Sequence, residues 1–145
     1  MNTTILKQLF KELLEIVAIP DIGYHKFENG CLKPVYKTET DILGMEKWKA
    51  VHEQQPVSIK DTIVLREISQ KKQPIEIYDT KNDARSAHEF FLFGVDSILI
   101  IPVVKMDEVK GIISIVSIGT LHSFTKAEID VCWSLSKYYL KDVVV

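Results

Sequence analysis

Two long apolar segments in the second half of the chain, residues 97–104 and 109–118, constrain the fold most strongly. The polar residues 105–108 between them predict a turn that joins two antiparallel strands. The second segment has almost no polar alternation, as its core sequence consists of Ile112, Ile113, Ser114, Ile115 and Val116. A strand of this kind is covered on both faces. We therefore expect this hairpin to lie at the centre of a buried sheet.

Helices are predicted at both ends of the chain. Residues 5–17 place their apolar side chains over about half of a helix circumference, which is wider than the ~100° stripe that one core contact requires. Either this whole arc packs in the core, or part of it packs on a second subunit. Near the other end, Thr125 and Glu128 form a capping box, flanked by a hydrophobic staple of Phe124 and Ile129. A final helix should therefore begin just after Thr125.

The intervening residues predict a second hairpin, because Asn29-Gly30 separates two strand-like runs and both residues tolerate positive φ. The other expected elements are a helix from Ser58 or Asp61 to about residue 72, a strand over 75–78 and a helix from residue 82 or 83 to about 93. Residues 39–56 are expected to be irregular. Two hairpins make the sheet at least partly antiparallel, so the fold class is α+β, within one domain over residues 1–145.

Composition excludes several classes of function. The formal charge of −2 provides no broad cationic field, so direct contact with nucleic acid is not expected. No apolar run approaches the ~20 residues that span a bilayer, and residues 5–17 are too often interrupted by charges to be a signal peptide. Cys31 and Cys132 form no C-x-x-C pair and are typical of reduced thiols in a cytoplasmic protein, although a disulfide stays open.

The sequence contains no recognisable catalytic or metal-binding motif. Among His25, His52, His88 and His122, no two stand at a metal-chelating spacing, so no metal is expected. His88-Glu89 begins like a zinc-protease helix, but Leu92 stands where the second ligand is needed. A partly buried histidine is therefore the favoured interpretation of His88. Nucleophile elbows and phosphate-binding glycine loops are also missing, which argues against an enzyme.

From about residue 73 onward, a series of short motifs resembles the GAF family. Its members typically carry a short strand ending in Asp, a polar helix, a Gly-x-x-Ser step, an apolar strand with Pro, a Gly-containing strand and Phe-Thr before the last helix. The matching segments here are residues 75–79, Asp83-Ala84-Arg85, Gly94-Val95-Asp96-Ser97, residues 98–103 with Pro102, Gly111-Ile112-Ile113 and Phe124-Thr125. The first 72 residues match only in the order of their elements.

This resemblance implies a GAF/PAS-like fold. An antiparallel sheet of five or six strands would carry the N- and C-terminal helices on one face and the ligand-pocket helices on the other. Family ligands include cyclic nucleotides, haem, bilins, small anions and amino acids. The chain lacks the Asn-Lys-Phe-Asp-Glu signature of cyclic-nucleotide binding, a suitably placed bilin cysteine and the clustered cysteines of the family's methionine sulfoxide reductases. No cofactor is therefore expected.

The resemblance implies a cytoplasmic, bacterial signal-sensing domain that binds a small molecule, dimerises through its terminal helices, or both. It would control an output module such as a transcription regulator, a diguanylate cyclase or a histidine kinase. A ligand between the sheet and residues 39–93 would be lined by Tyr36, Trp48, Arg66, Tyr78, Arg85, His88, Phe91 and Ser97, with Arg66 or Arg85 as an anion clamp. The alternatives are a dimerisation scaffold without a ligand and an enzyme of GAF fold.

Overall fold

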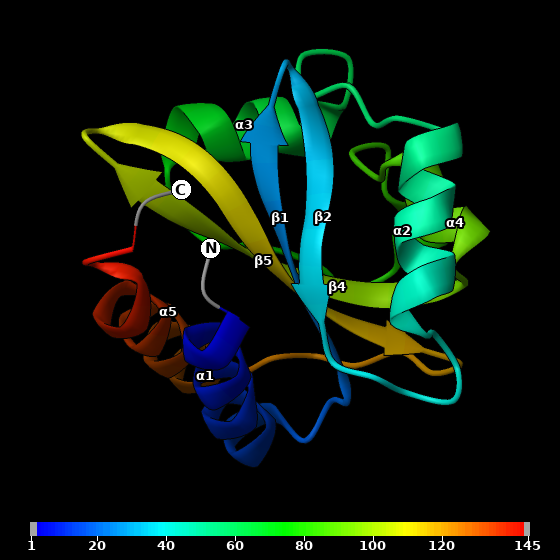
Figure 1. Cartoon of the computed structure of the whole chain (residues 1–145). Coiled ribbons are helices and arrows are strands. Elements are labelled where there is room, and N and C mark those ends of the chain that lie inside the picture. Colours follow the sequence, from blue (N-terminus) through cyan, green and yellow to red (C-terminus); the bar gives the residue numbers. More distant parts are fainter. Residues whose placement is uncertain (1–2, 144–145) are drawn as a thin grey trace.

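A five-stranded antiparallel sheet in the order β2-β1-β5-β4-β3 forms the centre of the molecule (Figure 1). The computed structural model describes residues 3–143, with every side chain except that of Phe91. The strands are β1 (Asp21–Glu28), β2 (Cys31–Lys37), β3 (Ile75–Ile77), β4 (Val95–Lys105) and β5 (Glu108–Ile118). In the apolar hairpin β4–β5, β5 is the middle strand of this sheet and β4 is its antiparallel neighbour, so the predicted α+β class and antiparallel pairing are confirmed.

The helices divide between the two faces of the sheet. They are α1 (Thr3–Val17), α2 (Met45–Gln54), α3 (Ile63–Lys71), α4 (His88–Leu92) and α5 (Lys126–Leu140), with a 3₁₀ turn η1 (Thr80–Asn82). The terminal helices α1 and α5 lie side by side on one face, whereas α3 and α4 cover the other and α2 packs along β2 (Figure 1). The expected placement of the terminal helices is confirmed. No helix within residues 3–143 is long and apolar enough to cross a membrane.

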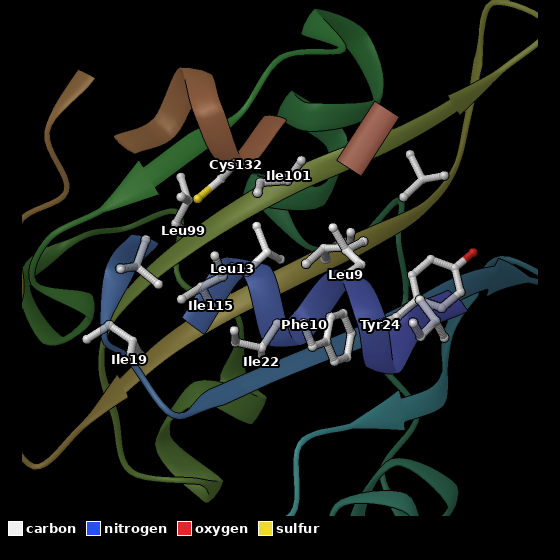
Figure 2. Close-up of a cluster of buried hydrophobic side chains, with 14 of the residues drawn as sticks. Leu9, Phe10, Leu13, Ile19, Ile22, Tyr24, Leu99, Ile101, Ile115 and Cys132 are labelled. Carbon is white, nitrogen blue, oxygen red and sulfur yellow. The ribbon is translucent and has the colours of Figure 1, made fainter. Parts of the chain in front are cut away.

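Each face of the sheet has its own hydrophobic core. Beneath the terminal helices, the side chains of α1 meet those of β1, β4, β5 and α5, including Leu13, Ile101 and Cys132 (Figure 2). The apolar arc of α1 belongs to this core, because Leu6, Leu9, Phe10, Leu13 and Val17 are buried and Ile5, Leu14 and Ile16 pack against them. The domain's own sheet and α5 therefore contact the whole arc. The second core lies between the other face and helices α3 and α4.

The local turn signals in the sequence are realised as predicted. Asn29 and Gly30 both have positive φ, and so do Met106 and Asp107 between β4 and β5. This conformation at both central residues matches the right-handed twist of the flanking strands. Pro102 lies beyond Ile100, the last residue of β4 that pairs with β3. At Pro102 the strand is paired with β5 alone, so the missing proline N–H interrupts no ladder between two neighbours.

Two predicted segments are wrong. Residues 39–56 contain helix α2, whose inward face consists only of Trp48 and His52, so its apolar signal is too weak for periodicity to reveal. The helix expected from residue 82 or 83 to 93 is reduced to the five residues of α4. Here the carboxylates of Asp79 and Asp83 accept hydrogen bonds from the backbone N–H groups of Lys81 and Arg85. Such local bonds replace the helical ones.

The capping box of α5 gives a first test of the fold. The Thr125 hydroxyl accepts from the Glu128 N–H at 3.1 Å, and the Glu128 carboxylate accepts from the Thr125 N–H at 2.8 Å. We expect Thr125→Ala to lower the free energy of unfolding by about 1 kcal/mol in urea titrations, because the helix loses one satisfied N–H group. Ser134→Ala, on the exposed side of α5, is the matched control and should change little. Equal losses in both variants would contradict the role of the cap.

Candidate functional site

Three ionisable side chains converge beneath helices α2 and α4. The Nε2 atoms of His25 and His52 lie 2.9 Å apart, and His52 Nε2 lies 2.9 Å from a carboxylate oxygen of Glu89. The exposed fractions of the three residues are 5%, 4% and 8%. Ionisable groups are seldom buried unless they are paired or bind an ion. This cluster is therefore the strongest chemical feature on the face of the sheet opposite the terminal helices.

The local fold explains how each member reaches the cluster. Tyr24 and His25 are adjacent in β1, which pairs regularly with β5 at both residues, so their side chains point to opposite faces of the sheet. Tyr24 packs under the terminal helices, whereas His25 borders the cavity on the other face. On α2, Trp48 and His52 are four residues apart and share the buried side of the helix. Helix α4 buries Glu89 and leaves His88 exposed.

Hydrogen bonds alone satisfy this cluster poorly. Burial lowers the pKa of His25 well below its usual value, and the nearby His52 lowers it further, so His25 is neutral at neutral pH. His52 Nε2 stands 2.9 Å from two partners, but it can carry only one hydrogen or one lone pair. One hydrogen shared between both partners is poorly aligned with each. The Nδ1 atoms of both histidines are buried without a hydrogen-bond partner among the described residues.

A cavity of about 40 Å³ adjoins the cluster. His25 and Glu89 border it, and its apolar wall includes Trp48, Phe93 and Ile98. The ring of Trp48 meets that of His25 edge-on, with their centroids 4.8 Å apart. The ring centroids of Phe93 and His52 lie 5.8 Å apart. A cavity of this size has room for only about three or four water-sized groups, since each needs about 10–15 Å³. The site therefore suits a ligand of very few atoms.

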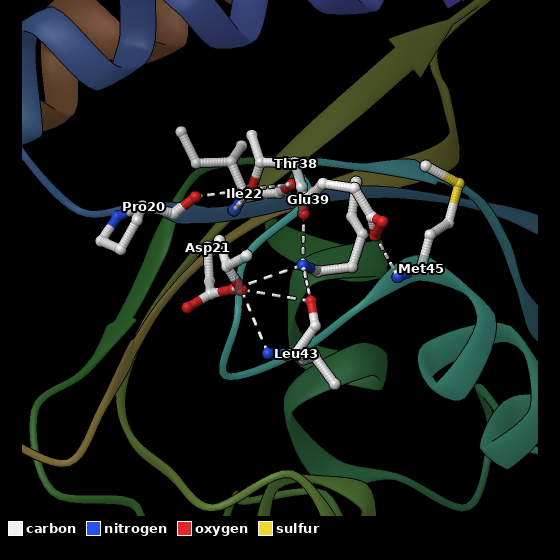
Figure 3. A network of polar contacts seen from close by, with 9 residues as sticks. Pro20, Asp21, Ile22, Thr38, Glu39, Leu43 and Met45 are labelled. Carbon is white, nitrogen blue, oxygen red and sulfur yellow. Dashed lines mark hydrogen bonds and ion pairs between the residues drawn. The ribbon is translucent and has the colours of Figure 1, made fainter.

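A buried ion pair of Asp21 and Lys37 borders the same cavity. Figure 3 shows the network of polar contacts around Asp21, Thr38 and Leu43 to which the pair belongs. Lys37 Nζ lies 3.3 Å from Asp21 Oδ1 and also donates to the backbone carbonyls of Thr38 and Leu43. Asp21 accepts a second hydrogen bond from the Thr40 hydroxyl at 2.7 Å. These contacts fix the loop that leads from β2 into α2. They therefore help to position Trp48 and His52 on that helix. The charges of Lys37 and Asp21 offset each other.

Of the residues predicted to line a pocket whose side chains the structure describes, Trp48 alone borders this cavity. Tyr36 lies on the opposite face, where its ring stacks on Phe10 at 5.9 Å, because it pairs with Tyr24 and directly opposed residues of two strands share a face. Ser97 is buried in β4 but holds the backbone together: its hydroxyl donates to the Tyr78 carbonyl and accepts from the His122 N–H. Neither Tyr36 nor Ser97 borders the cavity.

The two predicted arginine clamps are engaged elsewhere. Arg85 forms a bidentate pair with Asp83 at 3.0 and 2.8 Å, and this pairing raises the pKa of the guanidinium while lowering that of the Asp83 carboxyl. Arg66 is exposed and donates to the Lys60 carbonyl. Tyr78 is half exposed, and His88 is exposed rather than partly buried as predicted. The side chain of Phe91 lies outside the described structure.

His25, His52 and Glu89 were not predicted from the sequence as members of a site. The expectation that no two histidines share a site considered only short spacings, whereas His25 and His52 are 27 residues apart in sequence. Two weak signals are present in the sequence. His25 alternates with the apolar Ile22 and Tyr24, and His52 stands four residues after Trp48. Neither signal identifies a partner without the tertiary fold.

Both cysteines are free, as expected of reduced thiols. Cys132 lies in the core beneath the terminal helices, and burial, followed by the charge of Glu128, raises its pKa to about 11 (Figure 2). Cys31 lies beside the β1–β2 turn, opposite Ser58. A protonated, buried thiol is a poor nucleophile. The two thiols thus occupy different parts of the fold and make no common site.

No protein-family model matches the sequence, and no curated protein matches it significantly. Solved structures match it closely in shape. A GAF domain/HD domain protein from Geobacter sulfurreducens has a TM-score of 0.77 and 17% identity, over 94% of this chain and 87% of that one. The GAF domain of a two-component sensor histidine kinase from Bacillus halodurans has a TM-score of 0.70 and 14% identity, over 99% and 95%.

One similar structure is an enzyme. The type II free methionine-R-sulfoxide reductase from Thermoplasma acidophilum has a TM-score of 0.68 and 19% identity, over 94% of this chain and 87% of that one. One fold can therefore carry either kind of function. Similarity at these identities concerns the backbone architecture, and on that evidence this chain has the GAF fold.

Proposed function

We propose that this chain is a regulatory sensor domain that binds a small ligand under α2 and α4 and signals through its terminal helices. The observation that carries this proposal is the placement of two adjacent residues of β1. His25 borders the buried cavity, whereas Tyr24 packs in the core formed by α1 and α5. A ligand that moves β1 by a fraction of an ångström would thereby repack the core under the terminal helices. Similar structures include a GAF domain from a sensor histidine kinase.

The proposal also covers dimerisation through the terminal helices in a cytoplasmic protein of one domain. Helix α5 carries Val131, Leu135 and Tyr138 at helical spacing, and Val131 and Tyr138 are 46% and 64% exposed. The apolar arc of α1 is already used inside the domain, so the candidate dimer contact lies on α5. A transcription regulator, a diguanylate cyclase or a histidine kinase is the proposed output module. Catalysis by thiols is disfavoured because Cys132 is buried and remote in the fold from Cys31.

Native mass spectrometry and sedimentation velocity test both parts of this proposal. We expect the wild-type protein to be a dimer, and the double variant Val131→Glu/Tyr138→Glu to be a monomer with unchanged circular dichroism, since two charges would face each other at the interface. Met106→Glu, which alters a 99% exposed residue in the β4–β5 turn, is the control and should leave the dimer intact. A monomeric wild type that retains no small ligand, and shows no thermal shift with a metabolite panel, would refute the proposal.

A further inference from the structure

We infer that His25, His52 and Glu89 bind one divalent transition-metal ion of the zinc or ferrous-iron type. The three donor atoms, one from each side chain, lie within 4.8 Å of one another. Two imidazole nitrogens and one carboxylate oxygen are donors that suit zinc and non-haem iron. Metal binding goes beyond the sensor function proposed above and stands without it.

Two of the three donor–donor distances fit an ion at the centre of the cluster, and the third, between His25 and Glu89, lies within 4.8 Å. Two donor atoms that are each about 2.05 Å from a metal ion lie about 2.9 Å apart at a right angle and about 3.3 Å apart at a tetrahedral angle. The contacts His25–His52 and His52–Glu89 are both 2.9 Å. The distance for a right angle therefore matches both contacts directly. A tetrahedral angle requires the two donors of each pair to move apart by only a few tenths of an ångström. Two donors of one ion are at most about 4.1 Å apart, so the Glu89 or His25 side chain must move inward wherever their separation exceeds that value.

An ion also resolves the conflict at His52. In its absence, His52 Nε2 has two close neighbours and only one hydrogen or lone pair to offer them. With an ion, both Nε2 lone pairs and the carboxylate would bind the same cation, and the imidazole hydrogens would lie on the Nδ1 atoms, which have no hydrogen-bond partner among the described residues. A neutral imidazole is the form that binds metal. The aromatic rings of Trp48 and Phe93 shield the cluster from water.

The protein would leave part of the coordination shell open. Three protein donors are typical of metal sites that keep a position for water or another ligand. His25 and Glu89 border the 40 Å³ cavity, so this position would face it. A divalent ion with one carboxylate keeps a charge of +1, and Asp21 and Lys37 offset each other. The ligand class is therefore a small anion or electron-pair donor of two or three atoms. This second step rests on the proposed sensor function.

Cobalt(II) titration of tag-free, chelator-treated protein tests the metal site. We expect one equivalent of Co²⁺ to bind with visible d–d bands, and Zn²⁺ to displace it. Glu89→Gln keeps the shape of the side chain but removes its charge, and should weaken binding at least about 100-fold, as should His52→Gln. His88→Gln, next to Glu89 in sequence but exposed, should bind like the wild type. Wild-type affinity in Glu89→Gln, or binding lost in His88→Gln alone, would overturn the assignment.

A second measurement does not depend on the folding of the variants. Zn²⁺ at about 100 times its Kd should raise the Tm of the wild type by about 8 °C, because it binds only the folded protein. The His88→Gln variant should show the same rise. A wild type with neither a rise in Tm nor Co²⁺ bands does not have this site. If the protein is monomeric and unresponsive to metabolites but binds one Co²⁺, the proposed function fails and the metal site stands.

Azide is the probe for the open position. Adding it to the Co²⁺-loaded protein should change the visible spectrum, because an anion entering the cavity changes the coordination of the ion. A filling substitution at the cavity wall, Gly23→Ala, should weaken this response, since its Cβ would stand 3.1 Å from the Trp48 ring. An unchanged spectrum in the wild type would show that the coordination shell is closed. That result would refute the ligand class while leaving the metal site in place.

Discussion

Replacing Lys37 by Met is expected to lower the free energy of unfolding by about 4 kcal/mol. The Lys37 and Asp21 side chains are only 3% and 2% exposed, and their charged atoms lie 3.3 Å apart. Removing the ammonium group leaves the Asp21 carboxylate in a low-dielectric environment, where the Thr40 hydroxyl is its one remaining side-chain donor among the described residues. The carbonyls of Thr38 and Leu43 lose a donor as well. Urea titration followed by circular dichroism measures the loss.

A double-mutant cycle separates the buried charge from other effects of Lys37→Met. Adding Asp21→Asn removes the isolated carboxylate, so the double variant should be more stable than the sum of the single losses by about 2 kcal/mol. Lys126→Met is the matched control, because the Lys126–Asp130 pair is 89% and 59% exposed and should contribute almost nothing. Strictly additive losses at Asp21 and Lys37 would show that the two charges do not interact in the folded protein.

The sequence predicts those parts of the fold that depend on neighbouring residues. Asn29-Gly30 adopts positive φ at both positions because the backbone preferences of these residues suffice for the turn. The Thr125–Glu128 capping box likewise closes within four residues. The hairpin β4–β5 is strongly encoded because an almost continuous apolar run has no other way to be buried. These elements place the sheet and the terminal helices correctly.

The candidate site could not be predicted in the same way. Its members come from β1, α2 and α4, and each depends on a contact that is distant in sequence. Strand alternation places His25 on the face opposite Tyr24, but the helices that cover that face come from other parts of the chain and leave no mark in the sequence of β1. Helix α2 presents only Trp48 and His52 to the interior, so it is held by the site as much as by its own propensity. The sequence pattern points instead to His88, which is exposed, because His88-Glu89 begins like the metal-binding helix of a zinc protease.

Replacing Gly111 is expected to have the second large effect. Gly111 on β5 lies against Tyr24 and His25 of β1, whose side chains face opposite sides of the sheet. A Cβ on Gly111 would stand 2.7 Å from the His25 carbonyl oxygen and 2.7 Å from the Tyr24 hydroxyl. The hydroxyl belongs to a fully buried ring, and the carbonyl belongs to the backbone of β1, so neither can withdraw easily. We expect Gly111→Ala to cost about 3 kcal/mol in urea titrations, as overpacking of a core does.

Gly30→Ala distinguishes this clash from the ordinary cost of replacing glycine. Gly30 has a φ of +76°, and a Cβ added there would meet nothing within 4 Å, so its replacement should cost only about 1 kcal/mol of backbone strain. Because β1 must move to relieve the clash at Gly111, the folded Gly111→Ala variant should also displace His25 from His52. It should therefore bind Co²⁺ more weakly, whereas Gly30→Ala should bind it normally. If Gly111→Ala is as stable as Gly30→Ala and binds Co²⁺ like the wild type, β1 does not couple the two faces, and the signalling route from His25 through Tyr24 to the terminal helices is wrong.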